Sequence, residues 1–205
     1  RDFLGYERGY IHLLKEYPKK VRHLIEVLTE KAREMQEVVL DSPADLILHG
    51  SHFDRQMTPP HIFEEFFVPY FKNFAKRLNE KGKKLACHLD AETEGLYELV
   101  LEVGVDVVDC FTTVPLVQKT TLENAREVWE GDIVIWGGIP SMILEPSYPK
   151  QKFEDYIENL FERIAPGDNI VLGIADNMMP GSEFDRVKEI SDMVRRRGEY
   201  PVKSL

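Results

Sequence analysis

The chain has 205 residues, 43% of them hydrophobic, and a formal net charge of −10 at pH 7. This length and apolar content can bury one substantial core, so we expect a single domain over residues 1–205. The negative balance argues against nucleic acid and anionic membrane surfaces as partners, because both recruit basic patches. No apolar run approaches the ~20 residues that a membrane-spanning helix needs.

Cysteine usage and the N-terminal residues together predict a cytoplasmic protein. Cys87 and Cys110 each lie in an apolar segment, which is typical of reduced thiols rather than of a disulfide framework. The first residues are polar and do not resemble a signal peptide. The sequence begins with Arg1 rather than Met, so we expect it to be part of a longer chain.

Apolar positions at helical spacing alternate with short β-branched runs along the chain. The predicted strands are 44–50, 84–88, 105–111, 133–136 and 169–174. The predicted helices are 18–39, 59–78, 92–102, 120–129, 152–164 and 182–197. Strands that are apolar throughout and alternate with helices indicate an α/β fold, in which helices cover a parallel sheet.

Polar side chains collect where the predicted strands end. His52 and Asp54 follow the first strand, His88 and Asp90 the second, Asp109 the third, and Asp176 and Asn177 the fifth. In a parallel α/β fold these carboxyl ends lie at one face, where ligand sites form in barrels and open sheets alike. The clustering therefore predicts a functional site, although a solvated loop or a helix cap is an equal alternative for some members.

His88 and Asp90 form the most informative pair. Side chains two residues apart at a strand end leave it on the same side. An imidazole and a carboxylate in that arrangement can clasp a metal ion or transfer a proton. The alternative is that Asp90 caps a helix beginning near Glu92. The pair alone leaves both interpretations open.

Several segments, in their order along the chain, resemble the uroporphyrinogen decarboxylase family. They are Glu64–Phe71, Gly104–Val108, Trp136–Pro140 and Leu172–Pro180. This family also contains corrinoid-dependent methyltransferases, which move a methyl group from cobalamin to a thiol. The resemblance implies a (β/α)8 TIM barrel with its site at the carboxyl ends of the strands. The chain would supply about the last five βα units. The first three strands, and the arginine-bearing segment with which decarboxylases grip carboxylates, would lie outside it.

Two departures from the family patterns bear on the subfamily. The methyltransferases carry His-x-Cys-Gly at the second of these strand ends and a further Cys in the closing loop, and these residues bind zinc. Here the same positions read His88-Leu89-Asp90-Ala91, with Asp176 in the closing loop. Decarboxylases lack the first His and have a His where this chain has Asp176. The chain thus keeps the methyltransferase His and replaces both thiolates with carboxylates.

This ligand set implies a metal-dependent enzyme of the family. His88, Asp90 and Asp176 would hold a divalent cation, with zinc preferred and manganese or iron as alternatives. Such a cation lowers the pKa of a coordinated thiol, alcohol or water and makes it a nucleophile. The predicted reaction is methyl transfer between a corrinoid protein and a small acceptor. The oligomeric state, including a homodimer, stays open.

Two other functions remain as alternatives. One is decarboxylation of uroporphyrinogen or a related carboxylate in tetrapyrrole biosynthesis, with His88 as proton donor and Asp109 or Asp176 stabilising a cationic intermediate. The other is a non-catalytic barrel that binds a corrinoid or a partner protein.

The predicted substrate-binding residues of the site are His52, Asp54, Phe111 and Asn177.

Overall fold

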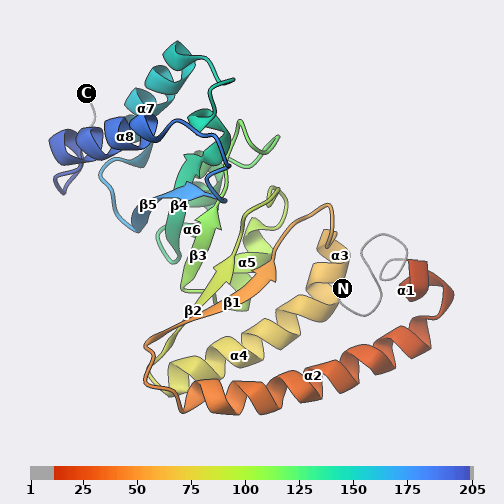
Figure 1. Cartoon of the computed structure of the whole chain (residues 1–205). Helices are drawn as coiled ribbons and strands as arrows, with labels where there is room; N and C mark the ends of the chain where they lie inside the picture. The colour runs from red at the N-terminus through yellow and green to blue at the C-terminus, as the bar shows by residue number, and fades with distance from the viewer. Residues whose placement is uncertain (1–11, 204–205) are drawn as a thin grey trace.

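The computed structural model describes residues 12–203, and these form a five-stranded parallel sheet in the order β1–β2–β3–β4–β5 (Figure 1). The strands are β1 (Leu46–His52), β2 (Lys84–His88), β3 (Val107–Phe111), β4 (Val134–Pro140) and β5 (Ile170–Ala175). Each neighbour in the sheet is also the neighbour in sequence, as in one side of a (β/α) barrel. The predicted parallel sheet is confirmed.

Helices alternate with these strands. They are α1 (His12–Glu16), α2 (Pro18–Leu40), α3 (Pro60–Ile62), α4 (Val68–Glu80), α5 (Tyr97–Val103), α6 (Leu122–Trp129), α7 (Lys150–Ile164) and α8 (Phe184–Arg197), with a π-helical turn η2 (Phe63–Phe67) and a 3₁₀ turn η3 (Ser141–Leu144). In Figure 1, α2 and α4 run along one end of the sheet, and α7 and α8 lie at the other. No helix in residues 12–203 is long and apolar enough to cross a membrane.

The core lies between one face of the sheet and the helices. Leu85, Cys87, Val108 and Ile135 point into it from the strands and are at most 2% exposed. The aromatic stripe predicted for residues 59–78 packs there as well: Phe63 stacks on Phe67, and Phe67 on Phe71, across η2 and α4. Because successive side chains of a strand point to opposite faces, the side chains between these buried ones lie on the other face of the sheet.

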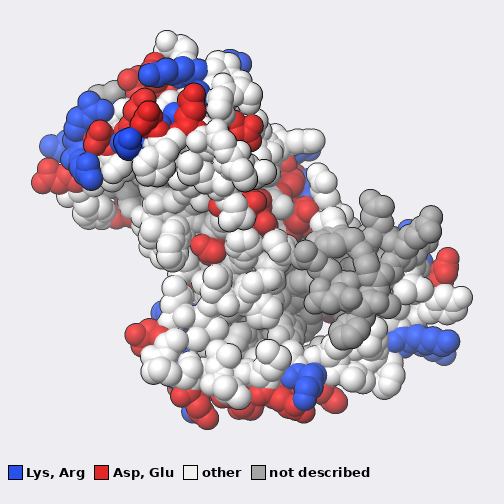
Figure 2. Space-filling view, in the orientation of Figure 1, with Lys and Arg blue, Asp and Glu red and all other residues white. Residues whose placement is uncertain are grey.

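The opposite face of the sheet is open. Leu46, Leu48, Trp136 and Val171 alternate with core residues along β1, β4 and β5, and each is between 41% and 55% exposed. Figure 2 shows a largely uncharged middle on the side in view, with charged side chains gathered over α7 and α8 and along α2. A parallel sheet that is covered by helices on one face and leaves apolar residues on the other is a partial TIM barrel.

Two loops differ from the sequence-based expectation. The helix after β2 begins at Tyr97 rather than near Glu92, so Asp90 does not cap it. The helix after β3 begins at Leu122 rather than at Thr120, and it is capped by Thr121, whose hydroxyl accepts a hydrogen bond from the Asn124 amide. Asp90 and Thr120 therefore lie outside these helices, and each contacts a residue of another segment of the chain, as described below.

Candidate functional site at the strand ends

The carboxyl ends of β1 and β2 bring two imidazoles together. The register between these strands shifts between His49 and His52, so that His52 lies opposite His88. Their ring centroids are 5.2 Å apart and the rings are nearly perpendicular. The irregularity in β1 therefore places His52 beside the predicted His88–Asp90 pair, as bulges at strand ends often re-aim a side chain.

A chain of polar contacts links four of the predicted residues. His52 Nδ1 lies 2.8 Å from Asp90 Oδ1, and Asp90 Oδ2 lies 3.5 Å from His88 Nε2. On its other side, His88 Nδ1 is 3.2 Å from Asp109 Oδ2. All four side chains are partly buried. A carboxylate that accepts from one imidazole nitrogen fixes the tautomer and leaves the second nitrogen for a metal ion or substrate.

Cys110 joins this site through an unusual backbone conformation. Its φ of 61° is in the left-handed region, and the β3–β4 register shifts between Val108 and Phe111. Strict alternation would place Asp109 and Phe111 on one face and Cys110 on the other. Instead Cys110 Sγ faces the loop after β5, 3.6 Å from the backbone oxygen of Asp176. Burial first, and then the nearby carboxylates, raise the pKa of the Cys110 thiol to about 12.

The same conformation sends Phe111 into the core. It is fully buried and packs edge-on against Trp129, with ring centroids 5.6 Å apart. Of the predicted site residues, Phe111 is therefore the one that lies away from the others, on the helix side of the sheet. We therefore do not include Phe111 among the residues that we propose to contact the substrate.

The loop residues near the cluster have defined contacts. Asp54 Oδ1 accepts a hydrogen bond from the Gln56 amide at 2.8 Å, and burial is the main cause that raises the pKa of the Asp54 carboxyl. Asn177 donates to Asp176 Oδ1 at 3.0 Å, and both side chains are exposed. Asp54 also interacts electrostatically with Asp90 and His52, and Asp176 lies near His88, so these loop residues border the histidine cluster.

Potential metal ligands form two overlapping groups among the described residues. One contains His52, His88 and Asp90, and the other His88, Cys110 and Asp176; within each, the ligand atoms lie within 4.8 Å of one another. The predicted trio of His88, Asp90 and Asp176 is divided between them, with His88 common to both. Imidazole, carboxylate and thiolate are all zinc ligands, so the donor chemistry fits a divalent cation of that kind.

Glu92 is a further residue at the site that the sequence reading did not single out. Its carboxylate is nearly buried and accepts hydrogen bonds from the Gln118 amide at 2.9 Å, the Lys119 amide at 2.8 Å and the Thr120 hydroxyl. Burial alone would raise the pKa of Glu92, but these hydrogen bonds outweigh it and the pKa is lowered. Glu92 therefore ties the loop that carries Asp90 to the loop after β3. A lone Glu before an apolar run gives no sequence signal for such a role.

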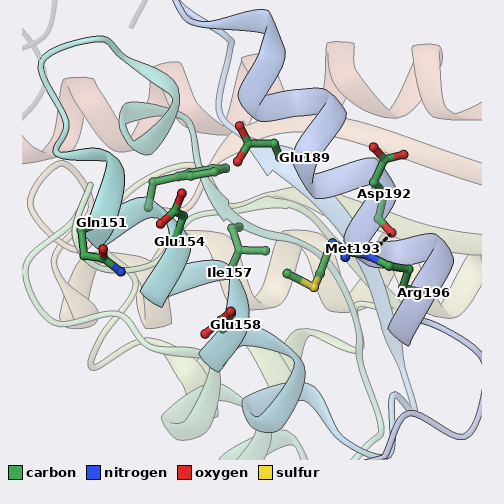
Figure 3. A pocket seen from close by; sticks show the side chains of 9 residues that line it. Gln151, Glu154, Ile157, Glu158, Glu189, Asp192, Met193 and Arg196 are labelled. Carbon is green, nitrogen blue, oxygen red and sulfur yellow. Dashed lines mark hydrogen bonds between the residues drawn. The ribbon is translucent and has the colours of Figure 1, made fainter.

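A groove between α7 and α8 is separate from the strand ends. Figure 3 shows it lined by side chains of α7, among them Glu154, Ile157 and Glu158, and by side chains of α8, among them Glu189, Met193 and Arg196. Lys150 pairs with Glu154 and Glu189 at 3.6 Å. None of the predicted site residues lines this groove, so it is a feature of helix packing on the outer layer.

Fold and site together define an enzyme-like partial (β/α) barrel, with its polar residues gathered at the carboxyl ends of the strands. Residues 7–197 match the family model described as "Uroporphyrinogen decarboxylase (URO-D)", and the chain belongs to this family. The resemblance read from the sequence is thereby confirmed.

A solved structure described as a methyltransferase from Methanosarcina mazei has the same fold. It superposes with a TM-score of 0.66 at 14% sequence identity, over 91% of this chain and 52% of that protein. The chain thus spans about half the length of this relative. No curated protein matches the chain.

Proposed function

We propose that this chain is part of an enzyme that catalyses metal-assisted methyl transfer between a corrinoid protein and a small acceptor. The observation that carries the proposal is the position of His88, which is shared by both groups of potential ligands and has Asp109 on its Nδ1. A metal-binding histidine commonly has such a carboxylate behind it. Family membership and the methyltransferase fold relative support the reaction class.

The residues of the site have distinct roles in this proposal. His88, Asp90 and Asp176 hold the cation, which when bound lowers the pKa of a coordinated acceptor thiol or alcohol. Asp109 orients the His88 ring. His52, hydrogen-bonded to Asp90, stands at the acceptor side together with Asp54 and Asn177, which would contact the substrate. Zinc is the expected ion, with manganese or iron as alternatives, and the reduced thiols agree with a cytoplasmic location.

Metal content tests the proposal directly. Full-length protein, purified without chelator, should contain close to one equivalent of a transition metal by plasma mass spectrometry, and His88→Ala and Asp176→Ala should each lose it. His23→Ala, an exposed position on α2, is the matched control and should retain the metal. A wild type without metal would refute the proposal. Acid–base decarboxylation or a non-catalytic binding role would then be the better explanation of the site.

Acid–base decarboxylation is the second candidate, and the contact chain from His52 through Asp90 and His88 to Asp109 favours it. Such a chain can deliver a proton to a carbon that loses carboxylate, while a carboxylate stabilises the positive charge. Arg55 is the nearby cation, but it is already paired with Glu94. Decarboxylation that persists after chelation and fails in His88→Gln would support this candidate over methyl transfer.

A further inference from the structure

We propose that Cys110, in place of Asp90, supplies a thiolate ligand to the bound cation, together with His88 and Asp176. This inference rests on the proposed metal site and specifies its ligands. From the sequence, Cys110 is predicted only to be a reduced thiol in an apolar strand. The structure instead places it at the strand end, among residues of three different elements.

The geometry brings three kinds of donor to one place. His88 ends β2, Cys110 lies in β3, and Asp176 directly follows β5. Their ligand atoms lie within 4.8 Å of one another. Around a tetrahedral zinc ion, with bonds of about 2.0–2.3 Å, neighbouring ligand atoms are about 3.3–3.8 Å apart. An exposed loop side chain such as Asp176 can close the remaining distance of about 1 Å by a change of rotamer.

Comparison of the two cysteines shows how the backbone conformation of β3 changes the direction of a side chain. Cys87 alternates normally in β2, points into the helix-covered core and is fully buried. Cys110 would point the same way if its φ were ordinary, but its left-handed conformation turns the thiol toward Asp176. A non-glycine residue in this conformation costs about 1–3 kcal/mol and often marks a functional position.

The existing hydrogen bonds also favour this group over the one with His52. His52 and Asp90 are bonded to each other at 2.8 Å, so a cation held by both would have to replace that bond. The contact of the Cys110 thiol with a backbone oxygen, at 3.6 Å, is weak by comparison. A cation on His88, Cys110 and Asp176 leaves the His52–Asp90 bond in place. Its mixed nitrogen, sulfur and oxygen donors select zinc over magnesium, calcium or manganese.

Cobalt substitution tests the thiolate ligand. Metal-free full-length protein is titrated with Co²⁺, and thiolate coordination is read from sulfur-to-cobalt charge-transfer absorption in the near ultraviolet. Wild type and Cys87→Ala should bind one equivalent with this absorption. Cys110→Ser should lack the absorption and bind Co²⁺ at least tenfold more weakly.

The outcomes separate this inference from the proposed function. One equivalent of Co²⁺ bound without the charge-transfer absorption, or with the absorption retained in Cys110→Ser, would overturn the role of Cys110 and leave the metal site standing. No binding of Co²⁺ or Zn²⁺ to wild type would overturn both. A second readout needs no variant: Zn²⁺ should slow alkylation of Cys110 in the wild type at least tenfold, and equal rates with and without Zn²⁺ would contradict the inference.

Discussion

Replacing Glu92 with glutamine should destabilise the protein through the loops around the site. The substitution keeps the shape of the side chain but removes its charge and turns one carboxylate oxygen into an NH2 group. Two backbone amides, of Gln118 and Lys119, converge on Oε2, and the Thr120 hydroxyl donates to Oε1. A glutamine in either orientation therefore leaves at least one buried donor without its acceptor.

The expected loss follows from the number and kind of these bonds. A hydrogen bond to a charged group contributes about 1.5–3 kcal/mol, and one to two of them are lost, so Glu92→Gln should lower the free energy of unfolding by about 3 kcal/mol. Because the pKa of Glu92 lies below its ordinary value of 4.5, its contribution is present above that pH. The contribution disappears as the pH falls through the lowered pKa.

Urea unfolding followed by tryptophan fluorescence measures this difference. Glu127→Gln on the exposed side of α6 makes the same chemical change and should alter the stability by no more than about 0.5 kcal/mol. At neutral pH, equal stability of Glu92→Gln and wild type would refute the reasoning. A penalty that stays constant when the pH is taken well below 4.5 would refute it too, because a protonated Glu92 and the glutamine that replaces it are both uncharged.

Three further predictions concern the backbone, the metal and the pH response. A Cβ on Gly137 would lie 2.5 Å from β3 backbone atoms at a φ of 146°, so Gly137→Ala should lose more than about 4 kcal/mol in urea unfolding, whereas Gly50→Ala, with open space, should change little. Asp109→Asn should weaken zinc binding about 10- to 100-fold in a competition titration, because the ring of His88 loses its charged acceptor. Burial lowers the pKa of His49, so wild type should lose stability below pH 6.5, and His49→Phe should reduce that loss.

Much of the fold could be predicted from the sequence because the strands are apolar on both faces and alternate with amphipathic helices. That pattern has few solutions besides a parallel sheet. The topology predicts that His52, His88, Asp90 and Asp109 lie near one another, because parallel strands end at one edge, and the irregularity in β1 sets the final position of His52. Neither conclusion required knowledge of any individual backbone angle.

The residues that escaped prediction depend on such angles or on long-range contacts. The left-handed conformation of Cys110 turns its thiol toward the site and sends Phe111 into the core, whereas strict alternation along the predicted strand 105–111 would place the two side chains the other way round. A cysteine carries no local signal for that conformation, unlike glycine. Glu92 reads as the start of a helix, but the helix begins five residues later, and its partners near Thr120 are distant in sequence.

The strand order has a consequence for how the chain folds. Paired residues in adjacent strands are only 21 to 38 positions apart, and no pairing joins the first strand to the last among the described residues. Each βα unit can therefore dock on the one synthesised just before it, without waiting for distant sequence. Closure of short loops is fast relative to long-range strand pairing. Assembly of the sheet can thus proceed one unit at a time from β1 to β5, and the cluster at the strand ends is complete only when the last strand has been added.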